Sequence, residues 1–229
     1  MAFGGRKMKK IFLTLLFCSF LSQCFALVPM TDENMMQAIN YGVASRQDKK
    51  SMADFLNPWK LEERLLKNPY REKETVVLYS PYLLAAIHAR DKVEESRVPE
   101  LADIKKAVSE YEGITLIGAR INAPVVLKEQ EYSVKLVQGK TELSPYAFNF
   151  LSWEMIDVVD RDAPAEVKKT GDIMRPETVQ PSKMKKVAVL DYQFYFDSAQ
   201  FDPNQVFSIL ISDKYCGERR FDIDPAAVR

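Results

Sequence analysis

Apolar residues recur with two different periods along the chain, and the change between them comes at Gly113. Before Gly113 the apolar positions lie three or four residues apart, which predicts helices. Thr31 is a suitable N-cap for the first helix. Asp32 and Glu33 follow it and place negative charge in the first turn, where this charge favours a helix. The apolar stripe of this helix consists of Met36, Ile39 and Val43.

Prolines mark the starts of three further predicted helices. Asn57-Pro58, Ser80-Pro81 and Pro99 each place proline at or near the first helical position, where its missing N–H is not needed. Asn68-Pro69 is the expected end of the first of these three. The β-branched run Thr75–Tyr79 predicts a short strand, and continuation of that strand past Ser80-Pro81 is the alternative to a helix there.

After Gly113 apolar and polar residues alternate, which predicts strands. In the longest run, Tyr192, Phe194 and Phe196 share one face. We expect the last three strands to form an antiparallel meander with one core face and one solvent face. The predicted strands are Ile114–Ile121, Tyr132–Val137, Lys186–Asp197, Val206–Ser212 and Arg219–Asp224.

These patterns predict an α+β fold, with a helical N-terminal part followed by an antiparallel β-sandwich of immunoglobulin-like architecture and a C-terminal three-strand meander. We expect residues 27–112 to be mainly helical with one strand, and residues 113–229 to form the β part, packed with the helices as one compact unit. Residues 160–185 are rich in charge and proline and have no period, which predicts a long mobile loop.

The first 26 residues have the three parts of a secretory signal peptide: a basic start, an apolar run and small residues before a cut. The apolar run Ile11–Leu21 has about 11 residues, whereas a membrane span needs about 20. We therefore expect cleavage after Ala26, export to the periplasm or the cell exterior, and no membrane span afterwards. The alternative is acylation of Cys24, which ends an imperfect lipidation box and would anchor the protein to a membrane.

Charge limits the partners that the chain can bind. The sequence has 32 basic and 32 acidic residues, and removal of the four basic residues of the predicted signal leaves 28 basic residues against 32 acidic ones. Nucleic-acid binding depends on clustered Lys and Arg, so we expect no nucleic-acid partner. Apolar residues make up 47% of the chain, which is enough for a folded core.

The sequence contains no recognisable motif for catalysis, metal binding or nucleotide binding. His88 is the only histidine, and no serine or aspartate is spaced to form a relay with it. Cys216 is the only cysteine outside the predicted signal, so neither an intramolecular disulfide nor a structural zinc site is expected. The acidic cluster at Asp157–Asp162 lacks the glycine of a calcium loop, and Asp222 and Asp224 are expected on the solvent face of a strand. We expect no catalytic residues, metal ligands or cofactor.

Tyr195 is the candidate for a surface aromatic contact, because it lies opposite the face that carries Phe194 and Phe196. Export, a sheet-rich fold and the lack of a catalytic grouping favour a non-enzymatic envelope protein with a binding or structural role. Its expected partner is an envelope protein or a cell-wall component. Two alternatives stay open: a hydrolase of an extracellular polymer that uses paired carboxylates, and a periplasmic assembly factor or chaperone that offers a sheet edge.

Overall fold

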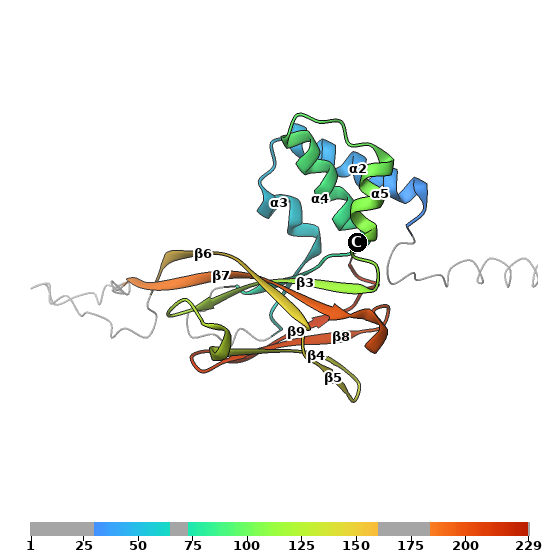
Figure 1. The fold of residues 1–229 in the computed structure, drawn as a ribbon. Coiled ribbons are helices and arrows are strands. Elements are labelled where there is room, and N and C mark those ends of the chain that lie inside the picture. Colours follow the sequence, from blue (N-terminus) through green and yellow to red (C-terminus); the bar gives the residue numbers. More distant parts are fainter. Residues whose placement is uncertain (1–29, 65–72, 160–183, 229) are drawn as a thin grey trace, which may run out of the picture.

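The computed structural model describes residues 30–64, 73–159 and 184–228. In these residues the chain forms four α-helices and two antiparallel sheets, of five and four strands, so the predicted α+β class is confirmed. Figure 1 shows the helices gathered on one side of the larger sheet and the smaller sheet on its other side.

Polar side chains start the helices where the sequence predicts them. Thr31 Oγ1 accepts a hydrogen bond from the Asn34 backbone N–H at the start of α2. Ser80 Oγ does the same for the Leu83 N–H at the start of α4, which begins with Pro81. The helix predicted there is confirmed, and the strand alternative is wrong. The helices are α2 (Asp32–Gln47), α3 (Met52–Leu56), α4 (Pro81–Glu94) and α5 (Leu101–Ser109), with 3-10 turns at Asn57–Trp59, Glu129–Glu131 and Ser198–Gln200.

Helices α2 and α4 approach closely because α2 has small side chains on its buried face. A Cβ atom on Gly42 would lie 2.1 Å from the Ala86 carbonyl oxygen, so only glycine fits at this crossing. The apolar stripe predicted for α2 is correct only in part, since Ile39 is buried whereas Met36 is 43% exposed. The buried residues of α2 are Met35, Ala38, Ile39, Gly42 and Ser45.

The helix predicted after Asn57-Pro58 is wrong. These residues form a single 3-10 turn, and the chain then extends as strand β1 (Lys60–Glu62). Helix α3 begins earlier, because Ser51 Oγ accepts a hydrogen bond from the Asp54 N–H and caps it. The helix end predicted at Asn68-Pro69 lies outside the described residues.

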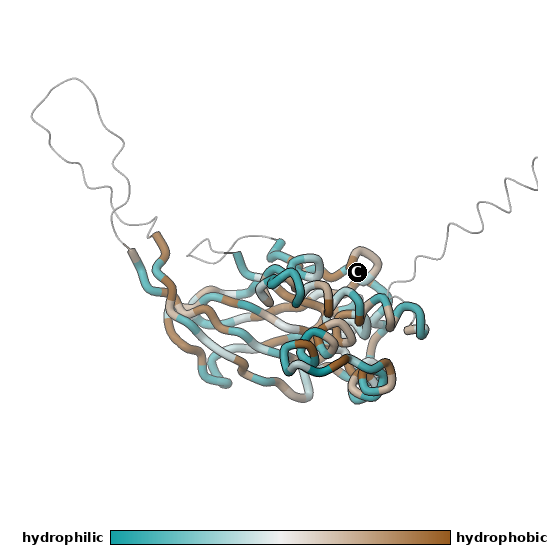
Figure 2. The backbone as a smooth tube through the Cα atoms, turned by 90° about the horizontal axis from the view of Figure 1, so that it is seen from above, coloured by the Kyte–Doolittle hydropathy of each residue, from teal (hydrophilic) through white to brown (hydrophobic). Residues whose placement is uncertain are grey.

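The larger sheet has the strand order β1-β2-β3-β7-β6, and every neighbouring pair is antiparallel. Strand β7 pairs with β3 on one side and with β6 on the other. Seen from above in Figure 2, β6 and β7 extend past the other strands. The β-branched run predicted β2 and alternation predicted β3 and β7, but neither pattern predicted β6. The bounds are β2 (Thr75–Leu78), β3 (Ile114–Ala123), β6 (Ala147–Val159) and β7 (Met184–Asp197).

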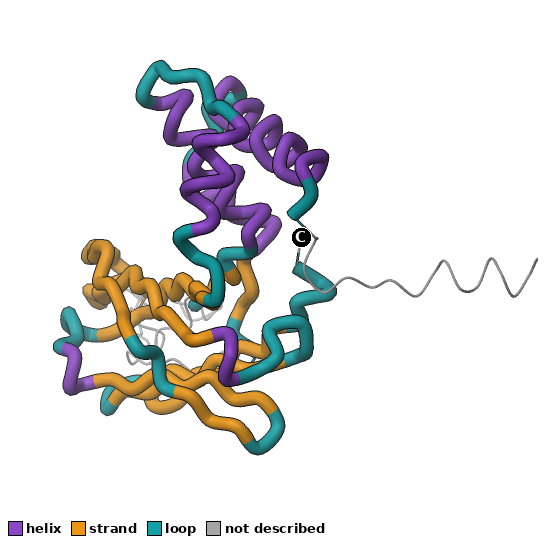
Figure 3. The backbone as a smooth tube through the Cα atoms, turned by 45° about the vertical axis from the view of Figure 1, so that its right-hand side comes forward, coloured by secondary structure: helices purple, strands orange, loops and turns teal. Residues whose placement is uncertain are grey.

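The smaller sheet has the order β5-β4-β8-β9. Strands β8 and β9 pair as predicted, but the three-strand meander is wrong, because β7 belongs to the larger sheet and the chain changes sheets between β7 and β8 (Figure 3). At one corner the sheets meet, where the Arg64 N–H donates to the Arg220 carbonyl of β9. The bounds are β4 (Tyr132–Gln138), β5 (Thr141–Leu143), β8 (Phe207–Asp213) and β9 (Gly217–Ile223).

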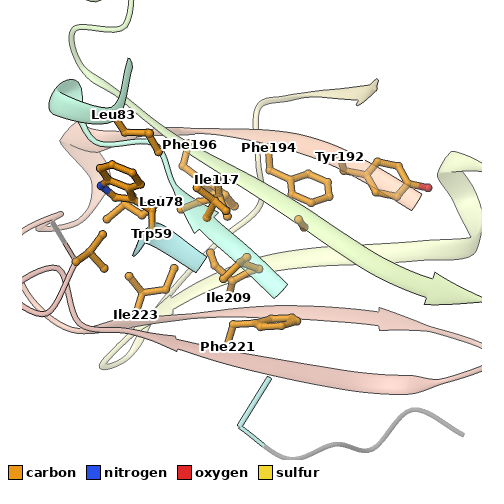
Figure 4. Close-up of a cluster of buried hydrophobic side chains, with 14 of the residues drawn as sticks. Trp59, Leu78, Leu83, Ile117, Tyr192, Phe194, Phe196, Ile209, Phe221 and Ile223 are labelled. Atoms are coloured by element: carbon orange, nitrogen blue, oxygen red, sulfur yellow. The ribbon is translucent and has the colours of Figure 1, made fainter. Parts of the chain in front are cut away.

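Inward side chains of both sheets fill one core between them. Figure 4 shows Phe194 and Phe196 of β7 on one side and Ile209 and Phe221 of the smaller sheet on the other, with Trp59 near the helices. All five side chains are at most 1% exposed. The inward face predicted for β7, β8 and β9 is therefore confirmed, and its burial is the main stabilising contribution to the fold.

The predicted signal peptide at residues 1–26, with Cys24 and Ala26, lies outside the described residues, as does most of the loop predicted at residues 160–185. The end of that loop prediction needs a correction, since Met184 and Lys185 already belong to β7. Within the described ranges, no helix is long and apolar enough to cross a membrane.

Candidate binding site

A groove opens between α3 and the face of the larger sheet that lies opposite the core. Its volume is about 450 Å³, within the range of roughly 300–1,000 Å³ that is usual for small-ligand sites. Helix α3 forms one wall, strands β2, β3 and β7 form the floor, and β6 forms the opposite wall. The apolar lining consists mainly of Met52, Leu56, Val77 and Leu151.

Helix α3 is fixed beside the sheet by an aromatic cluster. Phe55 of α3 is fully buried, and its ring centroid lies 5.3 Å from that of Tyr41 and 5.9 Å from that of Trp59. The Tyr41 hydroxyl donates a hydrogen bond to the Phe55 carbonyl oxygen at 3.3 Å. Lys60 closes the end of α3 by donating from Nζ to the Ala53 carbonyl at 2.9 Å. This short helix is therefore a stable wall although it has little intrinsic helix stability.

Ion pairs orient the polar side chains of the groove. Arg120 of β3 places Nη1 2.9 Å from Asp191 Oδ2 of β7, and its Nη2 donates to Glu154 Oε1 of β6. Ser152 Oγ donates to the same Asp191 oxygen at 3.0 Å. Partly exposed ion pairs of this kind contribute only about 0–1 kcal/mol each. Their consequence is positional, because one guanidinium links the three strands on the groove side of the sheet.

Tyr79 lies against the strand backbone in this groove. A Cβ atom on Gly118 would lie 2.7 Å from Tyr79 Cε2, so the absence of a side chain at Gly118 makes room for the ring. Burial raises the pKa of the Tyr79 hydroxyl, and a hydrogen bond with Gln193 lowers it in part. The hydroxyl therefore stays protonated at neutral pH, and the groove contains an aromatic ring with a neutral polar group.

Tyr195, the predicted surface aromatic, is partly buried on the same side of the larger sheet but does not line the groove. Its hydroxyl donates to Gln193 Oε1 at 3.2 Å and accepts from Asn149 Nδ2 at 3.0 Å. Its ring centroid lies 6.4 Å from that of Tyr146. The structure thus joins Tyr195 to strand β6, and a surface contact through Tyr195 stays a prediction.

The other residues considered from the sequence do not come together. His88 lies on α4, and Asp222 binds the Ser208 hydroxyl at 2.7 Å across the smaller sheet. Cys216 is buried, and this burial raises the pKa of its thiol to about 12. Among the residues that the structure describes, no three His, Cys, Asp or Glu side chains cluster so as to hold a metal ion. Part of the acidic cluster at Asp157–Asp162 lies outside those residues.

Two features of the structure, the groove and a buried cluster of charges, were not predicted from the sequence. Arg219 of β9 is fully buried and binds Glu74 and Asp213. The sequence does indicate that Arg219 is buried, because Arg219 lies two residues before the inward Phe221 and strand alternation places both on the core face. The groove had no such signal, since its lining comes from α3 and from five strands that are spread along the sequence between residues 60 and 192.

A scan against models of protein families found no match to this chain, and searches of curated proteins and of solved structures found none either. The geometry of the groove and the fold therefore carry the functional argument.

Proposed function

We propose that this chain is an exported, non-enzymatic binding protein of the cell envelope and that the groove beside α3 is its ligand site. The observation that carries the proposal is the combination of apolar walls with oriented charged side chains on the sheet. Ligand sites commonly have this composition, in which a mostly apolar lining provides affinity and a few placed polar groups provide specificity.

The charges around the groove indicate the chemistry of the ligand. Arg120 and Lys60 are balanced by Asp191 and Glu154, so the groove has no excess charge that selects an anion or a cation. We infer a ligand with apolar groups and with polar groups of both charge signs, as peptide-bearing fragments of a cell wall have. The hydroxyl of Thr75 adds a hydrogen-bonding group at the groove lining.

The N-terminal sequence supports the proposed location. A basic start, a short apolar run and the small residue Ala26 are the pattern of a cleaved export signal. Acylation of Cys24 is the alternative, and it would keep the exported protein on a membrane. For the fold, we propose a β-sandwich of immunoglobulin-like architecture, supported by the core that Phe194 and Phe221 share between the two sheets.

Filling the groove tests the proposed site. Thr75→Trp places a large side chain in the groove, whereas Thr141→Trp places the same side chain on the exposed edge strand β5. In calorimetric titrations with purified soluble cell-wall fragments, we expect Thr75→Trp to weaken binding about tenfold or more and Thr141→Trp to bind as the original chain does. Circular dichroism confirms that both variants fold. Lack of binding by the original chain, or equal binding by the two variants, contradicts the proposal.

Two further assays on the same proteins separate the alternative functions. A hydrolase releases reducing ends or peptides from the fragments, which mass spectrometry of the titration mixture detects. An assembly factor suppresses the aggregation of unfolded envelope proteins, and the Thr75→Trp change leaves that activity intact. Either result replaces the proposed binding role.

Export is tested on the protein produced in a bacterial cell. N-terminal sequencing and intact mass of the fractionated protein are expected to give Leu27 as the first residue. A mass that includes lipid on Cys24 supports the anchored form instead. Recovery of the uncut chain from the cytosol contradicts export.

A further inference from the structure

Strand β6 leaves an edge of the larger sheet uncovered. It pairs with β7 on one side, and among the described residues no strand pairs with its other side. Large apolar side chains are exposed along this strand, which is unusual for a long edge strand. They are Phe150, Leu151, Trp153, Met155 and Val159, of which Leu151 and Trp153 are each 53% exposed.

Strand β6 also lacks most of the features that keep sheet edges from associating. Natural edge strands are protected by shortness, by proline, by lysine or by bulges. Strand β6 runs from Ala147 to Val159 without proline, lysine or arginine, and its one irregularity lies between Phe150 and Ser152. The stretch from 153 to 159 is a regular strand, and no strand of the described ranges pairs with the backbone groups on its outer side. The edge strand β5 of the other sheet, by contrast, covers only Thr141–Leu143.

The end of this stretch pairs with β7 alone and packs by one face against the smaller sheet, because Val158 of β6 and Val187 of β7 are buried with Cys216 of the turn between β8 and β9. The last residue of β3 pairs with Ala188, so residues 184–187 of β7 pair with β6 alone. Figures 1 and 2 show this two-stranded ribbon projecting past the other strands, with hydrophobic residues along it. The outer edge of β6 is therefore the side on which a further strand can pair, since among the described residues no strand occupies it.

We propose that β6 pairs with β6 of a second copy of this chain, antiparallel and about a two-fold axis, to join two sheets edge to edge. Such an axis stands perpendicular to the sheet and leaves each side chain on its own face. Directly opposed residues in antiparallel strands also share a face. Opposed residues are therefore an even number of positions apart in the sequence, and the axis passes beside the residue midway between them. That residue lies opposite the same residue of the second copy, so only a few registers are possible.

Charge and packing select one of these registers. An axis at Glu154 or Asp157 would place like charges opposite each other, which is unfavourable. An axis at Met155 would place Trp153 opposite an aspartate. An axis at Ile156 places Trp153 opposite Val159 of the second copy, an aromatic and β-branched pair that stabilises sheets, and it separates all carboxylates.

The second copy fits this edge better than an unrelated strand, because each partner supplies what the other exposes. Trp153 and Val159 lie at the two ends of the regular stretch. The two-fold axis therefore places Trp153 of each copy opposite Val159 of the other, and this contact occurs twice in the dimer. The charge of Glu154 is already balanced by Arg120 of its own chain, so no basic residue is required from the partner. An interface related by a two-fold axis needs this self-complementarity.

Three lysine variants test the pairing by light scattering coupled to gel filtration. The original chain is expected to elute with twice the mass of one chain. Trp153→Lys loses its opposed Val159 contact and is expected to be a monomer. Met155→Lys faces Asp157 of the second copy in the Ile156 register and is expected to stay a dimer. Val98→Lys, at a loop position that is 81% exposed, is the control and is also expected to stay a dimer.

A cross-link provides a second measurement that does not depend on the lysine variants. Ile156→Cys places two thiols opposite each other across the axis, at a Cα separation that a disulfide accepts. Oxidation is expected to convert this variant to a covalent dimer, whereas the original chain treated in the same way stays uncross-linked. Neither Trp153 nor Ile156 lines the groove, so ligand binding is unaffected. A monomeric original chain, or a dimer that survives Trp153→Lys, overturns the proposal and leaves the edge to a strand of another protein.

Discussion

Arg219 Nε lies 2.7 Å from Glu74 Oε2, and both side chains are fully buried although 145 residues separate them in the sequence. Arg219 belongs to β9 and Glu74 precedes β2, so the pair links the two sheets. Arg219 also binds Asp213 Oδ2 at 2.5 Å and donates to the Asn122 carbonyl at 2.8 Å. One guanidinium thus serves two carboxylates, which fixes β9 against the end of β3.

Removal of this guanidinium is expected to destabilise the fold strongly. Arg219→Ala leaves Glu74 and Asp213 buried without their cation, and breaking a buried ion pair in this way typically costs about 3–5 kcal/mol. The matched control is Arg220→Ala, because Arg220 is exposed and its ion pair with Asp222 contributes at most about 1 kcal/mol. Urea unfolding monitored by circular dichroism measures both. Equal effects of the two substitutions would contradict a special role for Arg219.

Glu74 makes the stability of the fold depend on pH. Burial raises the pKa of Glu74 from 4.5 to about 7, an effect that the neighbouring Arg219 only partly offsets. The folded chain therefore binds this proton more tightly than the unfolded chain does. The contribution of Glu74 to the free energy of unfolding is complete below pH 4.5 and is lost as the pH rises toward about 7.

Glu74→Gln removes this titration, because glutamine resembles the protonated carboxyl at every pH. As the pH rises from the lower to the higher of the two pKa values, the free energy of unfolding of the original chain is expected to fall by up to about 3 kcal/mol. Urea unfolding measures this decline, which the variant lacks. All other titrating groups are common to both proteins, so they cancel in the difference. Parallel stability curves for the two proteins would show that Glu74 keeps its ordinary pKa.

Strand β7 illustrates how much of the fold the sequence predicts. Its side chains alternate from Leu190 onward, and Tyr192, Phe194 and Phe196 point inward as the sequence predicts. Helix α4 was predicted for an equally local reason, the N-cap Ser80 followed by proline. Asn57-Pro58 gives the same local signal, but there only one 3-10 turn forms before the chain joins the larger sheet as β1. Pairing between strands overrides the local preference at that point.

Strand β6 and the groove could not be predicted, for two different physical reasons. In β6 the bulge between Phe150 and Ser152 shifts the alternation by one residue, so apolar residues no longer keep to one face. The groove depends on contacts that no local pattern encodes, such as the ion pair between Arg120 and Glu154. Its polar residues look like ordinary solvent-facing strand positions when each is considered alone.

Gly42 is expected to tolerate no side chain. Gly42→Ala places Cβ against the Ala86 carbonyl oxygen, so α2 and α4 must move apart. Alanine favours a helix over glycine by about 1 kcal/mol, whereas overpacking costs about 1–3 kcal/mol. A net loss in the free energy of unfolding is therefore expected, measured by urea titration. Ala44→Gly on the exposed side of the same helix gives the propensity difference alone, and a stabilised Gly42→Ala variant would show that the helices adjust freely.

Cys216 is expected to be chemically inert while the protein is folded. Its thiol is buried near Asp213 and Glu74, and burial raises its pKa to about 12 even though the nearby Arg219 favours the thiolate. The thiolate is the reactive form, and an unperturbed thiol has a pKa of about 8.5, so at pH 8 the folded state holds less thiolate by a factor of roughly a thousand. Iodoacetamide labelling, followed by peptide mapping of the Cys216 peptide, is expected to be slow in buffer and rapid in urea. Similar rates in both conditions would mean that the turn between β8 and β9 opens readily, and the Arg219 cluster beside it would then be less rigid than its distances imply.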